Sequence, residues 1–463
     1  MNEPDRSAAL AALRQTLPDR SLLTDPDLME SYRIDRAMFC ESGMPLAVVR
    51  ARETAEVSAA MKIAHEFRIP VVPQGVRSGL AGAANAIDGC IVITVEAMDE
   101  VLHIDEANRY VVTQPGVLNA NLARTVAEHD LFYPPDPSSK EFCSIGGNLS
   151  TNSGGLCCVK YGVTTDYVLA LEVVLADGQV LRTGRTTVKG VAGYDLARLF
   201  VGAEGTLGII TEATLRLRAA AEKPRTLAAT FTDANQAASA VSTIVKSGVV
   251  PSLLEFMDRT SVKVVNDEFQ LGFDETVDAV ILAQSDSGGA PGDAEIEEIA
   301  RILRDADATD VIIADSAQEA DALLAARREV LTAFETLGTT MVDDVCVPRN
   351  RLADLIDGIA KIAVDKDLTI GVVGHAGDGN FHPTVVFDNS DDDESRRAHE
   401  AFDEVMMLGL QLGGTITGEH GVGLLKRGPL ESEVGELSLS IQRAIKQAID
   451  PDGILNPGKV FDR

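Results

Sequence analysis

Three glycine-rich segments in the first half of the chain place the strongest constraint on its fold. They are PQGVRSGLAGAANA (residues 73–86), YPPDPSSKEFCSIGGNLSTNSGG (133–155) and KGVAGYDLARLFVGAEGTLGIIT (189–211). Glycine lets successive backbone N–H groups point at one anion without obstruction from a Cβ atom. Three such segments within one α/β domain indicate a large ligand that lies across the domain.

The first segment, taken alone, leaves two interpretations open. Gly75, Gly79 and Gly82 follow an apolar strand, where they suit either a pyrophosphate group or a tight structural turn. Their spacing matches neither the dinucleotide motif GxGxxG nor a phosphate loop that ends in Lys-Ser or Lys-Thr. The second segment is the stronger signal, because a long stretch with no predicted strand or helix inside a compact domain usually has a function.

The chain, at 463 residues, is too long for one hydrophobic core. We expect a first domain over residues 1–222, a second over 223–415 and a C-terminal segment over 416–463 that completes the active site. Within the second domain the order strand, helix, strand occurs over 226–258 and again over 279–314, which predicts a ferredoxin-like antiparallel sheet with helices on one face. The predicted fold class is α+β, with a helical C-terminal segment.

The net charge of −30, from 41 Lys and Arg against 71 Asp and Glu, limits the ligands that the chain can bind. This field repels phosphate backbones and anionic membrane surfaces, so we expect no nucleic-acid partner. It also repels anionic substrates. A site for a carboxylate must therefore have its own local positive charge from Arg, His or a metal ion.

The cysteines and the N-terminus indicate a reduced, cytoplasmic protein. The six cysteines contain no CxxC pair, which argues against an iron–sulfur domain or a zinc knuckle. The first residues, MNEPDRSAALAALRQTLPDR, lack the basic start and the apolar core of a signal peptide, and no run approaches the length of a transmembrane segment. The acidic run Asp391–Glu394 is expected to be a solvated loop.

The motifs of the first half resemble the FAD-binding domain of the p-cresol methylhydroxylase and vanillyl-alcohol oxidase superfamily. The resemblance covers roughly residues 45–220 and rests on GVRSGLAG, PPDPSS with SIGGN and TNSGG, KYGVTTDYV and AGYDLARLFVGAEGTLGIIT. It implies a two-subdomain domain that binds FAD. The residues that it places against FAD are Gly75, Val76, Arg77, Ser78, Gly79, Leu80, Pro135, Ser139, Cys143, Gly146, Gly147, Asn148, Thr151, Asn152, Glu204, Gly205, Ile209, Ile210 and Asn456.

Two positions depart from this family pattern. Arg77 stands where many relatives have a third glycine in the first loop, which changes the reach of that loop. Ser78 stands where members with a histidyl-flavin bond have the linking histidine. We therefore expect the chain to bind FAD non-covalently.

Two histidines flank a predicted hairpin in the second half of the chain. The segment GVVGHAGDGNFHPTVVF (371–387) reads as two strands around an Asp-Gly turn. With Asp378 and Gly379 as the turn residues, His375 and His382 face each other directly, with their Cβ atoms roughly 4.5–5.5 Å apart. Two imidazoles at that distance can hold one metal ion. The alternative is a pair of half-buried histidines that pack as aromatic rings.

A second motif, TGEHGVG, places Glu419 beside His420. Adjacent side chains of an extended segment point to opposite sides, so one can bind a metal while the other faces a different partner. Together, HAGDGNFHP and TGEHGVG resemble the C-terminal domain of the FAD-linked D-2-hydroxyacid dehydrogenases, a looser resemblance that covers about residues 225–460.

This second resemblance implies metal-assisted oxidation of a D-2-hydroxy acid, of the lactate, glycolate or 2-hydroxyglutarate class, to the 2-oxo acid. It makes His375, His382 and Glu419 the ligands of a divalent metal, Zn²⁺ or Mn²⁺, and His420 the general base. Hydride would pass to the flavin. The reduced flavin then needs an electron acceptor, which could be a quinone, a cytochrome, an electron-transfer flavoprotein or oxygen.

The same resemblance implies which residues bind the small 2-hydroxy carboxylate. Arg327, in LLAARREVL, falls where relatives have the arginine that clamps the substrate carboxylate. Relatives often have Trp three positions earlier, where this chain has Leu324, so Arg328 stays open as the alternative to Arg327. Asn380 is a candidate contact to the substrate or to the metal ligands. A homodimer is among the assemblies open to the chain.

Three other functions fit parts of the sequence. An oxidase or an alkyl-transferring enzyme of the same FAD fold would act on another alcohol or phenol and would need no site with two histidines and a glutamate. A metal-dependent hydrolase with a nucleotide-binding regulatory domain would explain the two halves separately. A non-catalytic flavoprotein subunit would only relay electrons to a partner.

Overall fold

The computed structural model describes residues 3–37 and 40–462, and these divide into two compact units that interleave along the sequence. The first unit contains Met1–Gly154, Val163–Ala220 and Glu419–Arg463, and the second contains Gly155–Gly162 and Ala221–Gly418. The segment that carries Glu419 and His420 therefore belongs to the same unit as most of the glycine-rich segments.

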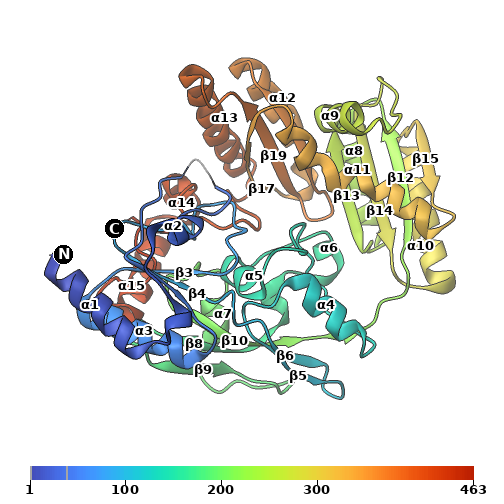
Figure 1. The fold of residues 1–463 in the computed structure, drawn as a ribbon. Coiled ribbons are helices and arrows are strands. Elements are labelled where there is room, and N and C mark those ends of the chain that lie inside the picture. Colours follow the sequence, from blue (N-terminus) through green and yellow to red (C-terminus); the bar gives the residue numbers. More distant parts are fainter. Residues whose placement is uncertain (1–2, 38–39, 463) are drawn as a thin grey trace. The chain divides into compact units, whose positions relative to one another are not determined.

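The first unit contains two main sheets (Figure 1). Its strands are β1 (Leu22–Leu23), β2 (Ala47–Arg50), β3 (Val71–Gln74), β4 (Ile91–Thr94), β5 (Val101–Asp105), β6 (Tyr110–Thr113), β7 (Leu131–Phe132), β8 (Val168–Val174), β9 (Val180–Gly184), β10 (Ile209–Arg216) and β11 (Arg218–Ala219). Its helices are α1 (Glu3–Thr16), α2 (Pro26–Met29), α3 (Thr54–Phe67), α4 (Asn119–Ala127), α5 (Ile145–Thr151), α7 (Leu196–Phe200), α14 (Arg427–Val434) and α15 (Glu436–Ile449).

The smaller of these sheets has the strand order β1-β2-β4-β3, with β2, β4 and β3 parallel. Its strands are rich in Val and Ile and are mostly buried, as expected for a parallel sheet that is covered on both faces. The end of the chain extends this sheet, because the N–H of Val71 donates to Ile454 O and the N–H of Asn456 donates to Val71 O. The larger sheet is antiparallel, in the order β5-β6-β10-β8-β9.

The second glycine-rich segment contains a helix that the sequence did not predict. Helix α5 begins after Ser144, whose side chain accepts a hydrogen bond from Gly147 N. The prediction of a stretch without its own helix was therefore wrong. Glycine lowers helix propensity, but the Ser144 cap and the close packing of Gly146 against Pro115, 2.7 Å from an ideal Cβ, favour the helix here.

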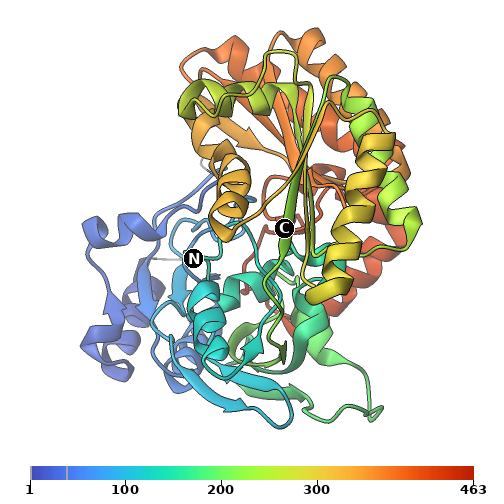
Figure 2. The same ribbon diagram turned by 90° about the vertical axis from the view of Figure 1, so that its right-hand side faces the viewer.

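The second unit is built on one antiparallel sheet, shown in Figures 1 and 2. The strand order is β15-β12-β14-β13-β18-β19-β16, and β17 also pairs with β19. The elements are α6 (Cys158–Tyr161), β12 (Arg225–Phe231), α8 (Ala234–Ser247), β13 (Leu253–Asp258), α9 (Arg259–Phe269), β14 (Ala279–Ser285), α10 (Gly289–Asp305), β15 (Asp310–Ile313), α11 (Ala317–Glu335), β16 (Thr339–Val342), β17 (Val345–Cys346), α12 (Leu352–Lys366), β18 (Thr369–His375), β19 (Asn380–Phe387) and α13 (Asp392–Gln411).

Helices cover both faces of this sheet, and the helices of the two predicted units, α8 and α10, share one face as predicted. Helices α8, α10, α12 and α13 pack side by side on one face, and α9 and α11 pack together on the other. The central strand β14 shows the reason. Val280 and Leu282 face the cluster formed with α9 and α11, while the alternating Ile281 is equally buried, so both sides of the strand need cover.

The acidic run near residue 391 begins a helix, so the prediction of a loop was wrong. Asp391 caps helix α13, and its side chain accepts hydrogen bonds from Asp393 N and Glu394 N. Carboxylates are favourable at the N-terminus of a helix, where unpaired N–H groups and the helix dipole meet them. Asp391, Asp392 and Asp393 are exposed, as predicted, and Glu394 is partly exposed.

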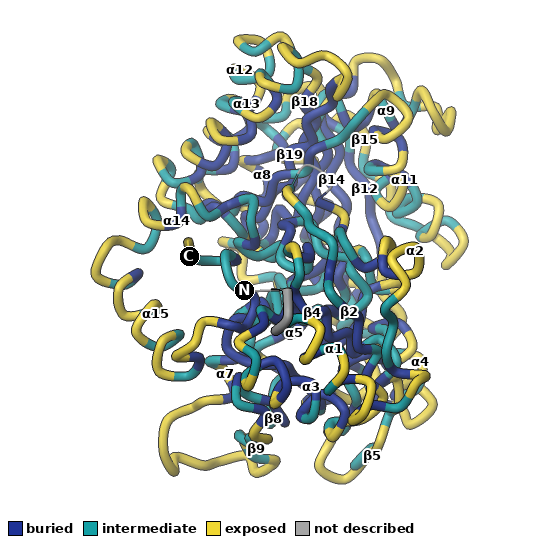
Figure 3. The backbone as a smooth tube through the Cα atoms, turned by 60° about the vertical axis from the view of Figure 1, so that its left-hand side comes forward, coloured by how far each residue is buried: buried dark blue, intermediate teal, exposed yellow. Residues whose placement is uncertain are grey.

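The burial pattern separates the cores from the surface. In Figure 3 the inner strands of both units are mostly dark blue, whereas the edge strands β5, β9 and β15 and most of α15 are exposed or only partly buried. Within the described part of the chain, no helix combines the length and the apolar character that crossing a bilayer requires.

Candidate active site

The hairpin β18–β19 carries His375 and His382, but in a register that differs from the predicted one. His375 pairs with Asn380, and His382 pairs with Val373, so the predicted direct opposition of the two histidines was wrong. The loop has four residues, Ala376–Gly379, instead of the two-residue Asp-Gly turn. A shift of two residues leaves both imidazoles on the same face of the sheet, with ring centroids 5.1 Å apart.

Neighbouring chain segments hold this longer loop. Gly377 N donates to Leu254 O, and Val347 N donates to Gly379 O. Gly379 has a φ of +83°, and an ideal Cβ there would lie 2.2 Å from Val347 O, so glycine is required at this position. Tertiary contacts to Leu254 and Val347 therefore decide the register, and the Asp-Gly sequence alone does not predict them.

Glu255 on β13 connects His375 to Arg327. Its Oε1 lies 2.6 Å from His375 Nδ1, and its Oε2 accepts a hydrogen bond of 2.8 Å from Arg327 Nε. The Glu255 side chain is fully buried. Burial raises the pKa of Glu255, but the neighbouring His375 and Arg327 outweigh this effect, so the pKa is below its ordinary value. A carboxylate on Nδ1 turns Nε2 of His375 toward the opposite side of the ring, the orientation typical of a metal ligand.

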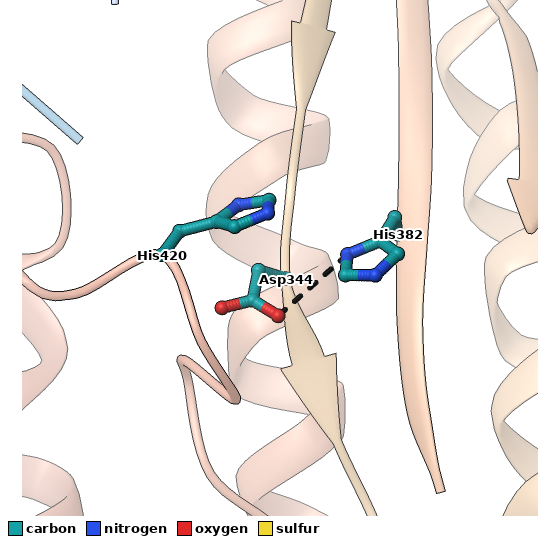
Figure 4. Close-up of side chains that lie close together, drawn as sticks. All are labelled: Asp344, His382 and His420. Atoms are coloured by element: carbon teal, nitrogen blue, oxygen red, sulfur yellow. Dashed lines mark ion pairs between the residues drawn. The ribbon is translucent and has the colours of Figure 1, made fainter. Parts of the chain in front are cut away.

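Asp344 plays a similar part beside His382 (Figure 4). Its Oδ1 lies 3.7 Å from His382 Nδ1 and accepts a hydrogen bond of 2.7 Å from Asn380 Nδ2. Its Oδ2 accepts a hydrogen bond of 2.8 Å from Thr417 Oγ1. The amide of Asn380, predicted to contact substrate or metal ligands, thus positions the carboxylate next to His382.

The sequence analysis missed both of these carboxylates. Glu255 lies within the apolar strand LLEFM, and Asp344 follows Asp343 at the end of β16; all three acidic residues have 0% relative exposure. A charged side chain in an otherwise apolar strand is costly unless it is paired. That cost is the signal that could have identified Glu255 from the sequence.

Glu419 and His420 follow directly on this cluster along the chain. Gly418, the last residue of the second unit, donates its N–H to Asp344 O, and an ideal Cβ at Gly418 would lie 2.4 Å from Asn380 Nδ2. Glu419 is the next residue along the chain and the first of the following segment of the first unit.

The three glycine-rich segments of the first unit meet around helix α5. Gly75 of the first segment packs on Ser144, because an ideal Cβ there would lie 2.6 Å from Ser144 Oγ. Gly202 N donates to Leu149 O, and Glu204 N donates to Ser150 O, which brings the third segment to the same helix. Backbone groups of all three segments therefore lie close to α5. A long cofactor with phosphate groups needs such backbone N–H groups from several segments.

Arg77 has a backbone conformation that side chains other than glycine rarely adopt. Its φ is +60°, in the left-handed region that favours glycine. Its Nη1 lies 3.1 Å from Glu96 Oε2, and its guanidinium lies over the ring of Tyr32, 4.4 Å from the centroid. Tyr32 OH also donates to Glu96, at 2.7 Å. This network holds the loop in a strained conformation.

The second segment forms a polar network around Asn148. Its Nδ2 donates to Cys143 Sγ at 3.3 Å, and its Oδ1 accepts a hydrogen bond of 3.1 Å from Asn119 Nδ2. Asn119 Nδ2 also donates to Pro135 O. Three of the predicted flavin contacts, Pro135, Cys143 and Asn148, are therefore held together by Asn119, which the sequence analysis did not identify.

The other predicted FAD contacts lie on the same segments, with the exception of Asn456. Their places are the first segment (Val76, Ser78, Gly79, Leu80), the second segment (Ser139, Gly146, Gly147, Thr151, Asn152) and the third (Gly205, Ile209, Ile210). Asn456 comes from the C-terminus, and its Nδ2 donates to Glu204 O and Ala83 O. The residues present thus fit a dinucleotide cofactor, by the convergence of three glycine-rich segments on α5.

The side chain of Glu204, a predicted flavin contact, accepts hydrogen bonds from two backbone N–H groups. Its Oε1 accepts a hydrogen bond of 2.7 Å from Val422 N, and its Oε2 one of 2.8 Å from Gly423 N. Burial raises the pKa of Glu204 to about 7, against the lowering effect of these two N–H groups.

Family models match both halves of the chain. Residues 45–184 match the model described as "FAD binding domain", and residues 220–460 match "FAD linked oxidases, C-terminal domain". The predicted resemblance to FAD-dependent enzymes is confirmed.

Curated relatives match nearly the whole chain. The glycolate oxidase subunit GlcD of Bacillus subtilis is 44% identical over 419 residues, which cover 90% of this chain and 89% of the relative. The D-lactate dehydrogenase of Anaerostipes hadrus is 35% identical, over 96% of each chain.

The crystal structure of p-cresol methylhydroxylase with substrate bound has the same fold. The TM-score is 0.81 at 16% sequence identity, with 100% of this chain and 98% of that one covered. This likeness confirms the predicted α+β fold class of the p-cresol methylhydroxylase type.

Proposed function

The chain belongs to the family of FAD-linked oxidases, and from this premise we propose that it is a dehydrogenase that oxidises a small D-2-hydroxy acid, or glycolate, to the 2-oxo acid. The names of its relatives, a glycolate oxidase subunit and a D-lactate dehydrogenase, support a substrate with a hydroxyl group next to a carboxylate. Lactate, glycolate and 2-hydroxyglutarate are the candidates within that class.

The observation that carries this proposal is the chain of contacts from Arg327 through Glu255 to His375. Arg327 uses its Nε for Glu255, and a guanidinium has further N–H donors that can bind a substrate carboxylate in a fork. Glu255 thus fixes the position of Arg327, the proposed partner of the substrate carboxylate, relative to His375, which we propose acts near the substrate hydroxyl. This is the local positive charge that the net charge of −30 requires.

We propose His375, His382 and Glu419 as the ligands of a Zn²⁺ or Mn²⁺ ion. Two imidazoles and one carboxylate are a donor set of catalytic divalent-metal sites, and the Glu255 carboxylate on His375 is the partner that such a ligand needs. The metal, when bound, lowers the pKa of a coordinated substrate hydroxyl. Glu419 supplies the carboxylate from the position that directly follows Gly418.

The residues of the chain then divide the remaining tasks. Arg327 orients the substrate carboxylate, and His420 accepts the hydroxyl proton near neutral pH. Asn380 positions the Asp344 carboxylate, which lies 3.7 Å from Nδ1 of His382 and favours a positive charge there. FAD, which the three glycine-rich segments would hold, would supply the acceptor for the hydride of the α carbon, and a separate electron acceptor would reoxidise it.

Anaerobic stopped-flow measurement of flavin bleaching tests the proposal. The purified FAD enzyme is mixed with D-lactate, glycolate, D-2-hydroxyglutarate, D-malate and the L-isomers. We expect rapid bleaching by one acid or a few, with the D-isomer preferred, and a loss of about 10²–10⁴-fold in the rate for His420→Ala at unchanged FAD content. The proposal fails if none of these acids bleaches the flavin of a fully loaded enzyme.

A further inference from the structure

The segment Glu419–Gly423 is fastened to the first unit through one buried carboxylate. Both oxygens of Glu204 accept hydrogen bonds from successive backbone N–H groups, those of Val422 and Gly423, at 2.7 and 2.8 Å. Two adjacent N–H groups that point at one carboxylate form an anion-binding nest, here filled by a side chain of the same unit. The proposed base His420 lies two residues before this nest.

The glycines of the motif EHGVG are required by this contact. Gly421 has a φ of +84°, and an ideal Cβ there would lie 2.9 Å from the Glu204 carboxyl carbon. Gly423 has a φ of +50°, and its ideal Cβ would lie 2.0 Å from Ala81 O. Leu424 N then donates to Ala81 O at 2.7 Å. The segment therefore runs in close contact with both Glu204 and the first glycine-rich segment.

Glu204 is itself held rigidly. Its backbone has a φ of +50°, its N–H donates to Ser150 O of α5, and its carbonyl accepts from Asn456 Nδ2 at 2.7 Å. The side chain is buried, with 5% relative exposure. Because both the backbone and the carboxylate oxygens of Glu204 are fixed by hydrogen bonds, this residue links the segment that follows His420 to α5.

We propose that Glu204 is a positioning residue that places His420 relative to the FAD-binding segments, and that this is the function of its side chain rather than contact with FAD. The inference rests on the proposed role of His420 as the base. Misplacement of a catalytic group by about 1 Å can lower a rate on the order of 100-fold. Loss of the Glu204 contact should therefore slow flavin reduction without loss of FAD.

The substitution Glu204→Gln tests this inference, because it keeps the shape and lets only one oxygen accept. In the full-length FAD enzyme, we expect hydrogen exchange in the peptide around Val422 and Gly423 to become at least about 10-fold faster, and flavin reduction on the order of 100-fold slower. FAD content should be unchanged. If Glu204→Gln does not fold, Glu204→Asp, which withdraws the carboxylate by one methylene group, should show the same changes to a smaller degree.

Glu172 provides the matched control. It is equally buried, with 5% relative exposure, in the same unit, but its partners are side chains of Thr54, Thr211 and Arg182. Glu172→Gln should lower the melting temperature without a selective change in exchange at Val422 and Gly423 or in the rate of flavin reduction.

The double variant Glu204→Gln with His420→Ala separates the outcomes. If Glu204 acts through His420, the double variant should reduce flavin as slowly as His420→Ala alone. Additive losses together with lost FAD would instead make Glu204 a flavin contact and overturn the inference. Unchanged exchange and rate in Glu204→Gln would also overturn it, whereas a full rate in His420→Ala would overturn the proposed base itself.

Discussion

Glu204 in the first unit and Glu255 in the second are both buried glutamates that accept two hydrogen bonds, yet their surroundings shift their pKa values in opposite directions. Glu204 faces two neutral backbone N–H groups, and burial raises its pKa to about 7. Glu255 faces Arg327 and His375, and these lower its pKa in spite of complete burial.

Because burial raises the pKa of both side chains, the charge of the hydrogen-bond partners accounts for the opposite directions of the two shifts. Backbone N–H groups orient a carboxylate without compensating its charge fully. A guanidinium and an imidazole compensate the charge, and they also make the carboxylate hard to replace. The first arrangement suits the positioning of a loop, and the second suits a site that must hold cations close together.

Metal removal should have the largest effect and should separate catalysis from flavin binding. Treatment with a chelator should lower the rate of flavin reduction by the substrate at least roughly 10³-fold. The reason is that the proposed metal stabilises the charge that develops on the substrate by several kcal/mol. The flavin spectrum, which depends on the first unit, should persist, and added Mn²⁺ or Zn²⁺ should restore the rate. Full activity after verified metal removal would refute the ligand set His375, His382 and Glu419.

Stability measurements should sharpen the contrast between the two glutamates. Glu255→Gln leaves the mostly buried Arg327 beside an uncharged partner and should cost about 3–5 kcal/mol of unfolding free energy. Glu204→Gln removes one acceptor from a backbone N–H and should cost about 1–3 kcal/mol. Urea unfolding of both variants at neutral pH checks the order. Equal losses would contradict the assigned importance of partner charge.

The pH dependence of stability should reveal the raised pKa of Glu204. A carboxyl whose pKa is higher in the folded than in the unfolded chain stabilises the fold at low pH, and this contribution is lost as the pH rises from 4.5 to about 7. The shift corresponds to roughly 3 kcal/mol, at about 1.4 kcal/mol per pKa unit.

Glu204→Gln should therefore be less sensitive to pH than the parent across this window, as measured by urea unfolding at several pH values. Asp35, whose pKa is raised to about 6 by burial, remains in the variant and keeps part of the slope. If stability depends on pH with the same slope in Glu204→Gln as in the parent, the Glu204 carboxyl of the parent does not take up a proton on folding.

Much of the fold was predictable because local patterns of apolar and turn-forming residues determine many of its helices and strands. The order strand, helix, strand predicted over 226–258 and again over 279–314 appears as β12, α8, β13 and as β14, α10, β15, and the predicted hairpin appears as β18 and β19. The predictions failed where a cap or a tertiary contact overrides the local pattern. Ser144 begins a helix among glycines, and Asp391 begins one in an acidic run.

The candidate site was predictable in its chemistry but not in its contacts. The two histidines of the hairpin were identified as a pair, and the structure places their rings 5.1 Å apart. The register was wrong by two residues, because the loop is held by Leu254 and Val347, which lie outside the hairpin. The roles of Glu419 and His420 stay predictions.

The sequence by itself determined which reactive groups are present and how they are spaced along short segments: two imidazoles around one turn, a glutamate next to a histidine, and glycines that free the backbone. Only the tertiary structure decided which groups face them. Glu255 is 120 residues from His375, and Glu204 is 218 residues from Val422. Partners so far apart are selected by strand pairing and loop packing, which no local pattern of residues encodes.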